Sequence, residues 1–174
     1  MDGPHVRGMR AMNLADALVE RGHRVTIWST DFHHQEKRHR YGRDERVTVS
    51  ESLEVRLVST VGYRRHVGPM RFIDHAQLGR RFAKLAREDT ATQPDVAFIG
   101  FPPIEIAAAA SRFCMDRRIP SVVDVKDLWP DLFEEVVPSV ARPLARVILA
   151  PLRRLAVRAL RDATALAAPT DSYL

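Results

Sequence analysis

One loop of the sequence concentrates residues that could do chemistry. Ser121 to Val125 is short, rich in β-branched residues and preceded by the turn sequence Arg118-Ile119-Pro120, which predicts a buried strand. Directly after it come charged side chains around an aromatic ring: Lys126, Asp127, Trp129 and Asp131. Pro130 disfavours a continued strand, so the chain is expected to turn here. Because loops at the carboxyl ends of parallel strands bind ligands in α/β folds, this loop is the first candidate site.

The same spacing also fits a structural role for this loop. An aspartate at a helix N-terminus accepts hydrogen bonds from backbone N–H groups that have no partner inside the helix. Asp127 or Asp131 could therefore cap the next helix, with Trp129 packed beneath it. Spacing alone leaves both interpretations open.

A glycine-bearing loop at the start of the chain is a second candidate. Gly3-Pro4-His5-Val6-Arg7-Gly8 leads into an apolar helical pattern that closes at Gly22, and a strand is predicted at Val25 to Ser29. The loop lacks the spacing of a dinucleotide-binding motif. A βαβ unit has a strand ahead of such a loop, so we expect the chain to begin inside the loop and to leave an exposed sheet edge beside Val25 to Ser29.

Two polar segments allow both a functional and a structural interpretation. Gly62 to Gly68 contains Tyr63 and several cationic residues, which suits either an ordinary exposed connection or a cradle for an anionic or sugar-bearing ligand. Asp31 to Arg46 contains three histidines, but no cysteine or well-spaced acid completes a metal-ligand set. We therefore expect a solvated, mobile loop at Asp31 to Arg46 rather than a metal site.

The remaining elements alternate between strand and helix. Strands or hairpin arms are predicted at 47–50 and 54–58, strands at 96–100 and 164–168, and helices at 70–87, 104–117 and 143–161. This alternation predicts an α/β fold with a Rossmann-like, doubly wound parallel sheet. With 174 residues, 45% of them hydrophobic, the chain is expected to form one domain over residues 1–174.

Composition narrows the compartment and the partners. The single cysteine, Cys114, cannot form an internal disulfide, which fits the cytoplasm. No signal peptide or membrane-spanning run is visible. The net charge of +5 is concentrated in one helical segment with six arginines and no acid: Arg142, Arg146, Arg153, Arg154, Arg158 and Arg161. A charge this local argues against a protein that coats nucleic acid.

The arginine-rich helix is amphipathic. At about 100° per residue, its leucine, isoleucine and alanine residues fall on one side and the arginines on the other. This arrangement suits a helix that packs its apolar side on the sheet and exposes a solvated cationic face. It equally suits a helix that lies on an anionic membrane or partner.

Several of these motifs together resemble one family. They are Gly8-Met9-Arg10 with Leu14-Ala15, Arg21-Gly22-His23-Arg24-Val25-Thr26, Pro94-Asp95-Val96, Val122 to Asp131 with its Asp-Leu-Trp-Pro-Asp block, and Ala168 to Leu174. In combination they resemble the N-terminal domain of family 4 glycosyltransferases, of the type that builds bacterial O-antigen, capsule and exopolysaccharide. The resemblance covers nearly the whole chain.

The resemblance implies one half of a GT-B fold, whose N-terminal domain binds acceptor and whose C-terminal domain binds a nucleotide-sugar donor. It implies glycosyl transfer with retention, without a cofactor or an obligatory metal. The first strand and the C-terminal donor domain have no counterpart in this sequence. We therefore expect the chain alone not to transfer sugar.

The resemblance also assigns residues. It places the glycine loop Gly3 to Gly8 near the donor diphosphate and acceptor, and it puts Asp127 and Lys126 at the cleft edge as the candidate catalytic residues. Together with the loops described above, the candidate substrate-binding residues are Gly3, His5, Gly8, Arg10, Tyr63, Trp129 and Asp131. Many family members have a histidine near the position of Lys126. A lysine can stabilise a departing diphosphate by charge, but it cannot reproduce the hydrogen bonding of a histidine.

The expected partners are a nucleotide sugar, held through the absent donor domain, and a glycan or lipid-linked acceptor. The six arginines would face an anionic membrane, which places the protein in the cytoplasm or on the inner face of the plasma membrane. Nucleic acid is not an expected partner. The alternative is a non-catalytic, truncated Rossmann module that binds a membrane surface or a partner chain.

Overall fold

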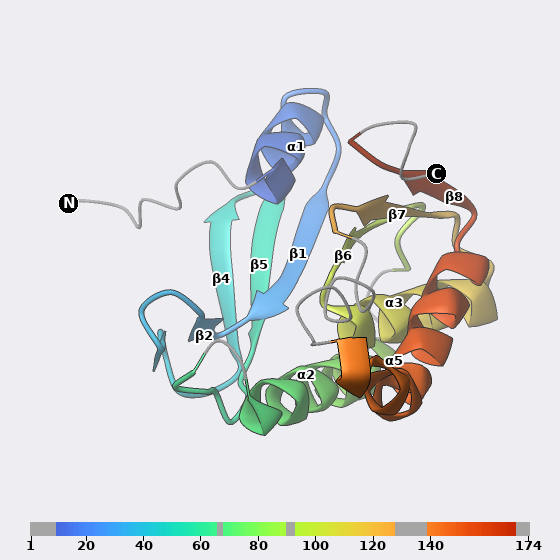
Figure 1. The fold of residues 1–174 in the computed structure, drawn as a ribbon. Helices are drawn as coiled ribbons and strands as arrows, with labels where there is room; N and C mark the ends of the chain where they lie inside the picture. The colour runs from blue at the N-terminus through green and yellow to red at the C-terminus, as the bar shows by residue number, and fades with distance from the viewer. Residues whose placement is uncertain (1–9, 66–67, 90–92, 128–138, 170–174) are drawn as a thin grey trace. The chain divides into compact units, whose positions relative to one another are not determined.

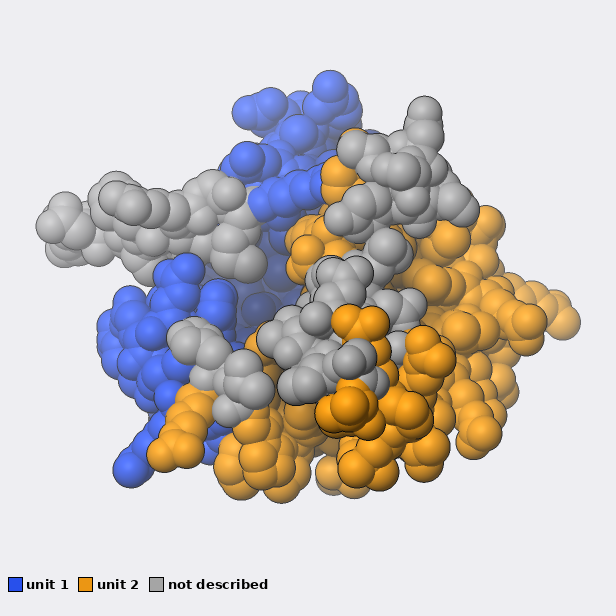
Figure 2. Space-filling model, viewed as in Figure 1, with its two compact units in different colours: residues 1–64 blue, residues 65–174 orange. Residues whose placement is uncertain are grey.

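The computed structural model describes residues 10–65, 68–89, 93–127 and 139–169. The chain divides into two compact units, Met1–Arg64 and Arg65–Leu174, which Figure 2 colours separately. Each unit combines α-helical structure with a three-stranded sheet that contains a parallel strand pair (Figure 1). The predicted α/β class with parallel strands is therefore confirmed.

Unit 1 is built on a sheet with the strand order β1-β5-β4. Helix α1 (Arg10–Val19) is followed by Gly22, whose φ of 84° suits a glycine, and β1 (Val25–Thr30) begins three residues later. Strand β1 pairs in parallel with β5 (Leu53–Val58), and β4 (Glu45–Ser50) pairs antiparallel with β5. Among the described strands β1 thus lies at an edge of this sheet, as predicted. The hairpin interpretation of the β4 and β5 segment is also confirmed.

A short two-stranded ribbon, β2 (Phe32–His33) with β3 (Arg38–His39), follows β1. Asp31 and Phe32, at its base, are buried. The expectation of a solvated loop over Asp31 to Arg46 is therefore wrong for Asp31 and Phe32, whereas most residues from His34 to Arg46 are exposed. The segment returns to the end of the sheet because buried groups hold it there.

Unit 2 alternates helices with parallel strands. Its described elements are α2 (Pro69–Glu88), β6 (Ala97–Phe101), α3 (Ile104–Arg117), β7 (Ser121–Val125), η1 (Ser139–Ala141), α5 (Arg142–Arg161) and β8 (Ala165–Ala167). Both β6 and β8 pair in parallel with the central β7. The predicted bounds of α3 and β7 match the structure, and those of α2, β6, α5 and β8 lie within one residue.

The core of unit 2 lies between one face of its sheet and two helices. Alternate residues of a strand point to the same face of the sheet. The side chains of Ile99, Phe101, Val123 and Val125 therefore all face this core. Small residues on α3 and α5, such as Ala107 and Ala159, are almost fully buried and let the two helices approach. This packing fixes the strand ends from which the candidate site projects.

Candidate active site

The carboxyl end of β7 presents the two predicted catalytic side chains. Lys126 and Asp127 follow the strand directly, and both are exposed. The backbone N–H of Lys126 donates to the carbonyl oxygen of Phe101 at 2.9 Å, so the pairing of β6 with β7 extends one residue past the strand. The two residues therefore leave from a fixed point of the sheet.

A buried carboxylate lies next to this lysine. Asp124 is fully buried in β7, and its Oδ2 lies 3.9 Å from the Nζ of Lys126. A Cβ placed on Gly100 of β6 would lie 3.9 Å from the same Nζ, so the amine lies close to the β6 backbone. Nearly half of the Lys126 side chain stays exposed. A cation held in this way can attract a phosphate at the sheet edge.

The helix that follows the neighbouring strand β6 carries a second acid, which is partly buried. Glu105 lies in the first turn of α3, and burial raises the pKa of its carboxyl. Its Oε2 lies 3.8 Å from the Nδ1 of His75 in α2. Burial, and secondarily the charge of Arg71, lowers the pKa of His75 to about 4, against an opposing effect of Asp74. His75 is therefore neutral at neutral pH, and the contact with Glu105 is not an ion pair.

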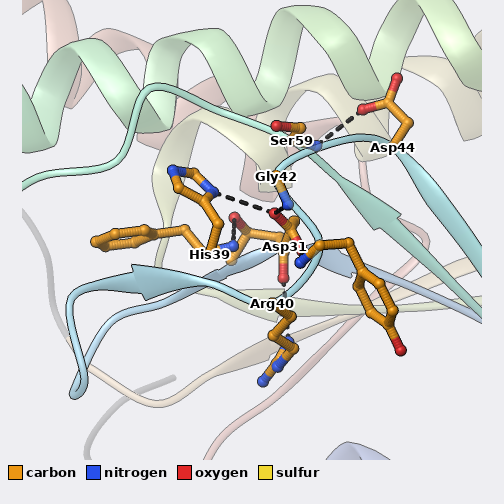
Figure 3. A network of polar contacts seen from close by, with 9 residues as sticks. Asp31, His39, Arg40, Gly42, Asp44 and Ser59 are labelled. Atoms are coloured by element: carbon orange, nitrogen blue, oxygen red, sulfur yellow. Dashed lines mark hydrogen bonds and ion pairs between the residues drawn. The ribbon is translucent and has the colours of Figure 1, made fainter.

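In unit 1, a single aspartate organises the loop at the end of β1 (Figure 3). The carboxylate of Asp31 accepts hydrogen bonds from the backbone N–H of Tyr41 at 2.8 Å and of Gly42 at 2.9 Å. Its Oδ2 also lies 3.1 Å from the Nδ1 of His39. Because the carboxylate is fully buried yet has these three partners, it ties the returning loop to the strand end.

Tyr63 packs against this loop. Its ring is buried, with its centroid 4.9 Å from that of Phe32 and with the Nζ of Lys37 4.5 Å away. A Cβ on Gly62 would come within 2.8 Å of the Phe32 ring, so only glycine allows this approach. The Tyr63 ring is thus held in one position against the loop that Asp31 organises in unit 1.

The structure describes only some of the predicted site residues. Arg10, exposed at the start of α1, and Tyr63 belong to unit 1, whereas Lys126 and Asp127 belong to unit 2. The others lie outside the described residues: Gly3, His5, Gly8, Trp129 and Asp131. Of the predicted set, the structure therefore brings together Lys126 and Asp127.

Sequence reasoning did not single out Asp31, Asp124 or Glu105. Asp124 carried a visible signal, because it is the one charged residue in the apolar run Val122 to Val125. Asp31 stands two residues after the predicted strand Val25 to Ser29, near the carboxyl end at which parallel strands bind ligands. Glu105 had no such signal, since an acid in the first turn of a helix is ordinary.

Among the described residues, no group of three or more histidine, cysteine, aspartate or glutamate side chains could hold a metal ion. No described helix combines the length and apolar content needed to cross a bilayer.

An α/β chain with charged residues at the carboxyl ends of parallel strands has the features of a Rossmann-like ligand-binding domain. The family model of the glycosyl transferase 4-like domain matches residues 8–174. The chain therefore belongs to the glycosyl transferase 4-like domain family. No curated protein matches it significantly.

Proposed function

We propose that this chain is the acceptor-binding half of a retaining glycosyltransferase with a GT-B architecture. Family membership supports glycosyl transfer in general. The observation that carries the proposal is the exposed pair Lys126 and Asp127, which leaves a fixed carboxyl end of a parallel sheet.

These two side chains suit the charges of the reaction. Glycosyl transfer breaks the bond between the anomeric carbon and the donor diphosphate and forms a bond to an acceptor hydroxyl oxygen. The ammonium group of Lys126 would stabilise the negative charge that develops on the departing diphosphate. The carboxylate of Asp127 would accept a hydrogen bond from the acceptor hydroxyl and hold that oxygen in place, and the hydroxyl proton would pass to the departing diphosphate. Gly3, His5, Gly8, Arg10, Tyr63, Trp129 and Asp131 are proposed to bind substrate.

The proposed acceptor is a glycan on a lipid carrier, in the synthesis of a cell-surface polysaccharide. Such an acceptor requires the enzyme to work at the inner face of the plasma membrane. The six arginines of α5 support this proposal, because anionic headgroups attract clustered cationic side chains. The nucleotide sugar would be held by a donor domain.

The test compares the purified chain with the same chain fused after Leu174 to a related donor domain. Each is given a panel of nucleotide sugars and lipid-linked acceptor extract. We expect transfer by the fusion only, because the anomeric carbon and the acceptor must be held by two facing domains. Turnover by the unfused chain would contradict the half-enzyme proposal, and an inactive fusion with every donor would favour a non-catalytic module.

Substitutions then test the site. Asp127→Ala is expected to lower kcat/KM of the fusion by roughly 100-fold, in the range found when one positioned group is removed from an active site. Asp95→Ala is the matched control, because Asp95 is also exposed but precedes the amino end of β6. Equal activity of the two variants would remove Asp127 from the site.

A further inference from the structure

Four large apolar side chains are exposed at the start of α5 and in the turn before it. Their exposed fractions are 90% for Val140, 64% for Leu144, 72% for Val147 and 67% for Ile148. Exposed apolar residues that stand singly are ordinary on protein surfaces, but a contiguous group marks an interaction site. These four lie within nine consecutive residues.

Helix α5 changes its role along its length. In its second half Ala156 and Ala159 are buried in the core, and Leu152 and Leu155 pack against that core beside α3. Among the residues that the structure describes, Leu144 and Ile148 of the first half do not join that core. Figure 1 shows α5 alongside α3 in unit 2. The interpretation in which the apolar side of this helix packs inward is thus supported in the second half of α5.

The exposed apolar residues share a face with some of the arginines but not with others. Leu144, Val147, Pro151, Arg154 and Arg158 follow one another at alternating spacings of three and four residues, which places them along one stripe of the helix. Arg154 and Arg158 are exposed, and neither side chain forms an ion pair with another described residue.

Two other arginines point elsewhere. At about 100° per residue, Arg142 and Arg146 lie roughly 100° or more around the helix from Leu144 and Val147. Both are exposed as well. They provide a control of equal charge on a different face of the same helix, although each of them also makes a contact of its own.

We propose that this stripe docks unit 2 on an anionic lipid bilayer. The exposed apolar side chains Val140, Leu144, Val147 and Ile148 enter the boundary between headgroups and acyl chains, while Arg154 and Arg158 bind lipid phosphates. A bilayer is the occupant that the charge favours, because residues 142–161 contain six arginines and no acid. The proposal specifies the membrane contact of the proposed function, and it requires no catalysis.

The first experiment measures binding of the purified chain to vesicles by sedimentation. Vesicles of phosphatidylcholine alone are compared with vesicles that contain phosphatidylglycerol. We expect binding to the anionic vesicles that weakens with salt. Since each arginine near an anionic surface contributes about fivefold, Arg154→Gln with Arg158→Gln should weaken binding roughly 25-fold. Arg142→Gln with Arg146→Gln should weaken it much less.

A second measurement reports insertion directly. Val147→Cys and Arg146→Cys are each labelled with a dye whose emission shifts to the blue in an apolar environment. Cys114 does not compete for the label, because it is buried and burial raises the pKa of its thiol to about 11. We expect a blue shift with anionic vesicles for the dye at position 147 and little change for the dye at position 146.

Several outcomes would overturn the proposal. They are no binding to anionic vesicles, equal loss of binding in the two arginine pairs, equal dye shifts at positions 146 and 147, or a dimer in solution that Val147→Ser dissociates. The last outcome would assign the stripe to a second copy of the chain. Because the vesicles contain no acceptor, vesicle binding by a chain whose fusion is inactive would contradict the proposed function alone. Transfer by a fusion that does not bind vesicles would contradict this inference alone.

Discussion

Gly79 tests how closely α2 and α3 pack. A Cβ built on Gly79 would lie 2.6 Å from the carbonyl oxygen of Glu105 and 2.9 Å from its carbonyl carbon. Both are backbone atoms in the first turn of α3, so no side-chain rotation can make room. The added methyl group of Gly79→Ala must therefore push the two helices apart.

The expected magnitude follows from two opposing effects. Alanine in place of glycine inside a helix gains about 1 kcal/mol of helix propensity. Forcing an extra methyl group into a close contact costs about 1–3 kcal/mol, and a backbone neighbour favours the upper part of that range. We therefore expect Gly79→Ala to lower the free energy of unfolding by about 1–2 kcal/mol, although the same change stabilises most helices.

The assay is urea denaturation followed by far-UV circular dichroism, with Gly100→Ala as the control. A Cβ on Gly100 would meet only the Nζ of Lys126, at an ordinary 3.9 Å. We expect this control to change stability by about 0.5 kcal/mol or less. If Gly79→Ala instead raised stability by the full helix propensity, α2 and α3 would not be in the contact that the structure shows.

Two further predictions concern buried ionisable side chains. Asp31→Ala leaves the N–H groups of Tyr41 and Gly42 without their acceptor, so it should lower the free energy of unfolding by about 2–4 kcal/mol and speed proteolysis between β1 and β4. The control Asp44→Ala removes an exposed acceptor and should lower it by about 1 kcal/mol. The pKa of His75 is about 4 in the folded state and about 6.5 in the unfolded state. Between these two pH values the unfolded chain binds more protons, so up to about 3 kcal/mol of stability is lost as the pH falls from about 6.5 to about 4. Urea midpoints at pH 7.5 and 4.5 should therefore differ less for His75→Gln than for the unsubstituted chain. Equal pH dependence of the urea midpoint in the two proteins would contradict the assignment of this effect to His75. The raised pKa of Glu105 has the opposite effect, because it makes stability rise as the pH falls.

Periodicity predicted the elements of unit 2 because local and tertiary preferences agree there. In β7 the β-branched run is also the buried run, and the turn at Pro120 limits it at one end. In α3 the alanine-rich pattern meets α5 through small side chains, so the helix forms where its composition favours it. At these elements nothing in the fold opposed the local signal.

The loop after β1 could not be predicted from its composition. Its residues are almost all polar, and a polar run is ordinarily solvated. Its order depends on one buried carboxylate, Asp31, whose partners lie 8, 10 and 11 residues further along the chain. These hydrogen bonds depend on how the loop folds back to the strand end, and the periodicity of the sequence does not predict that.

The packing of the arginine-rich helix α5 could likewise be predicted only in part from the sequence. A helical wheel separates apolar residues from arginines, yet it cannot tell that the core ends midway along the helix. Pro151 stands near that point, and a proline cannot donate the hydrogen bond that the carbonyl of Val147 would otherwise accept. The backbone is therefore weakest between the half that packs on α3 and the half that presents Leu144 and Val147. This weak point would let the exposed half adjust to a bilayer without disturbing the packed half, which holds the core beneath Lys126 and Asp127.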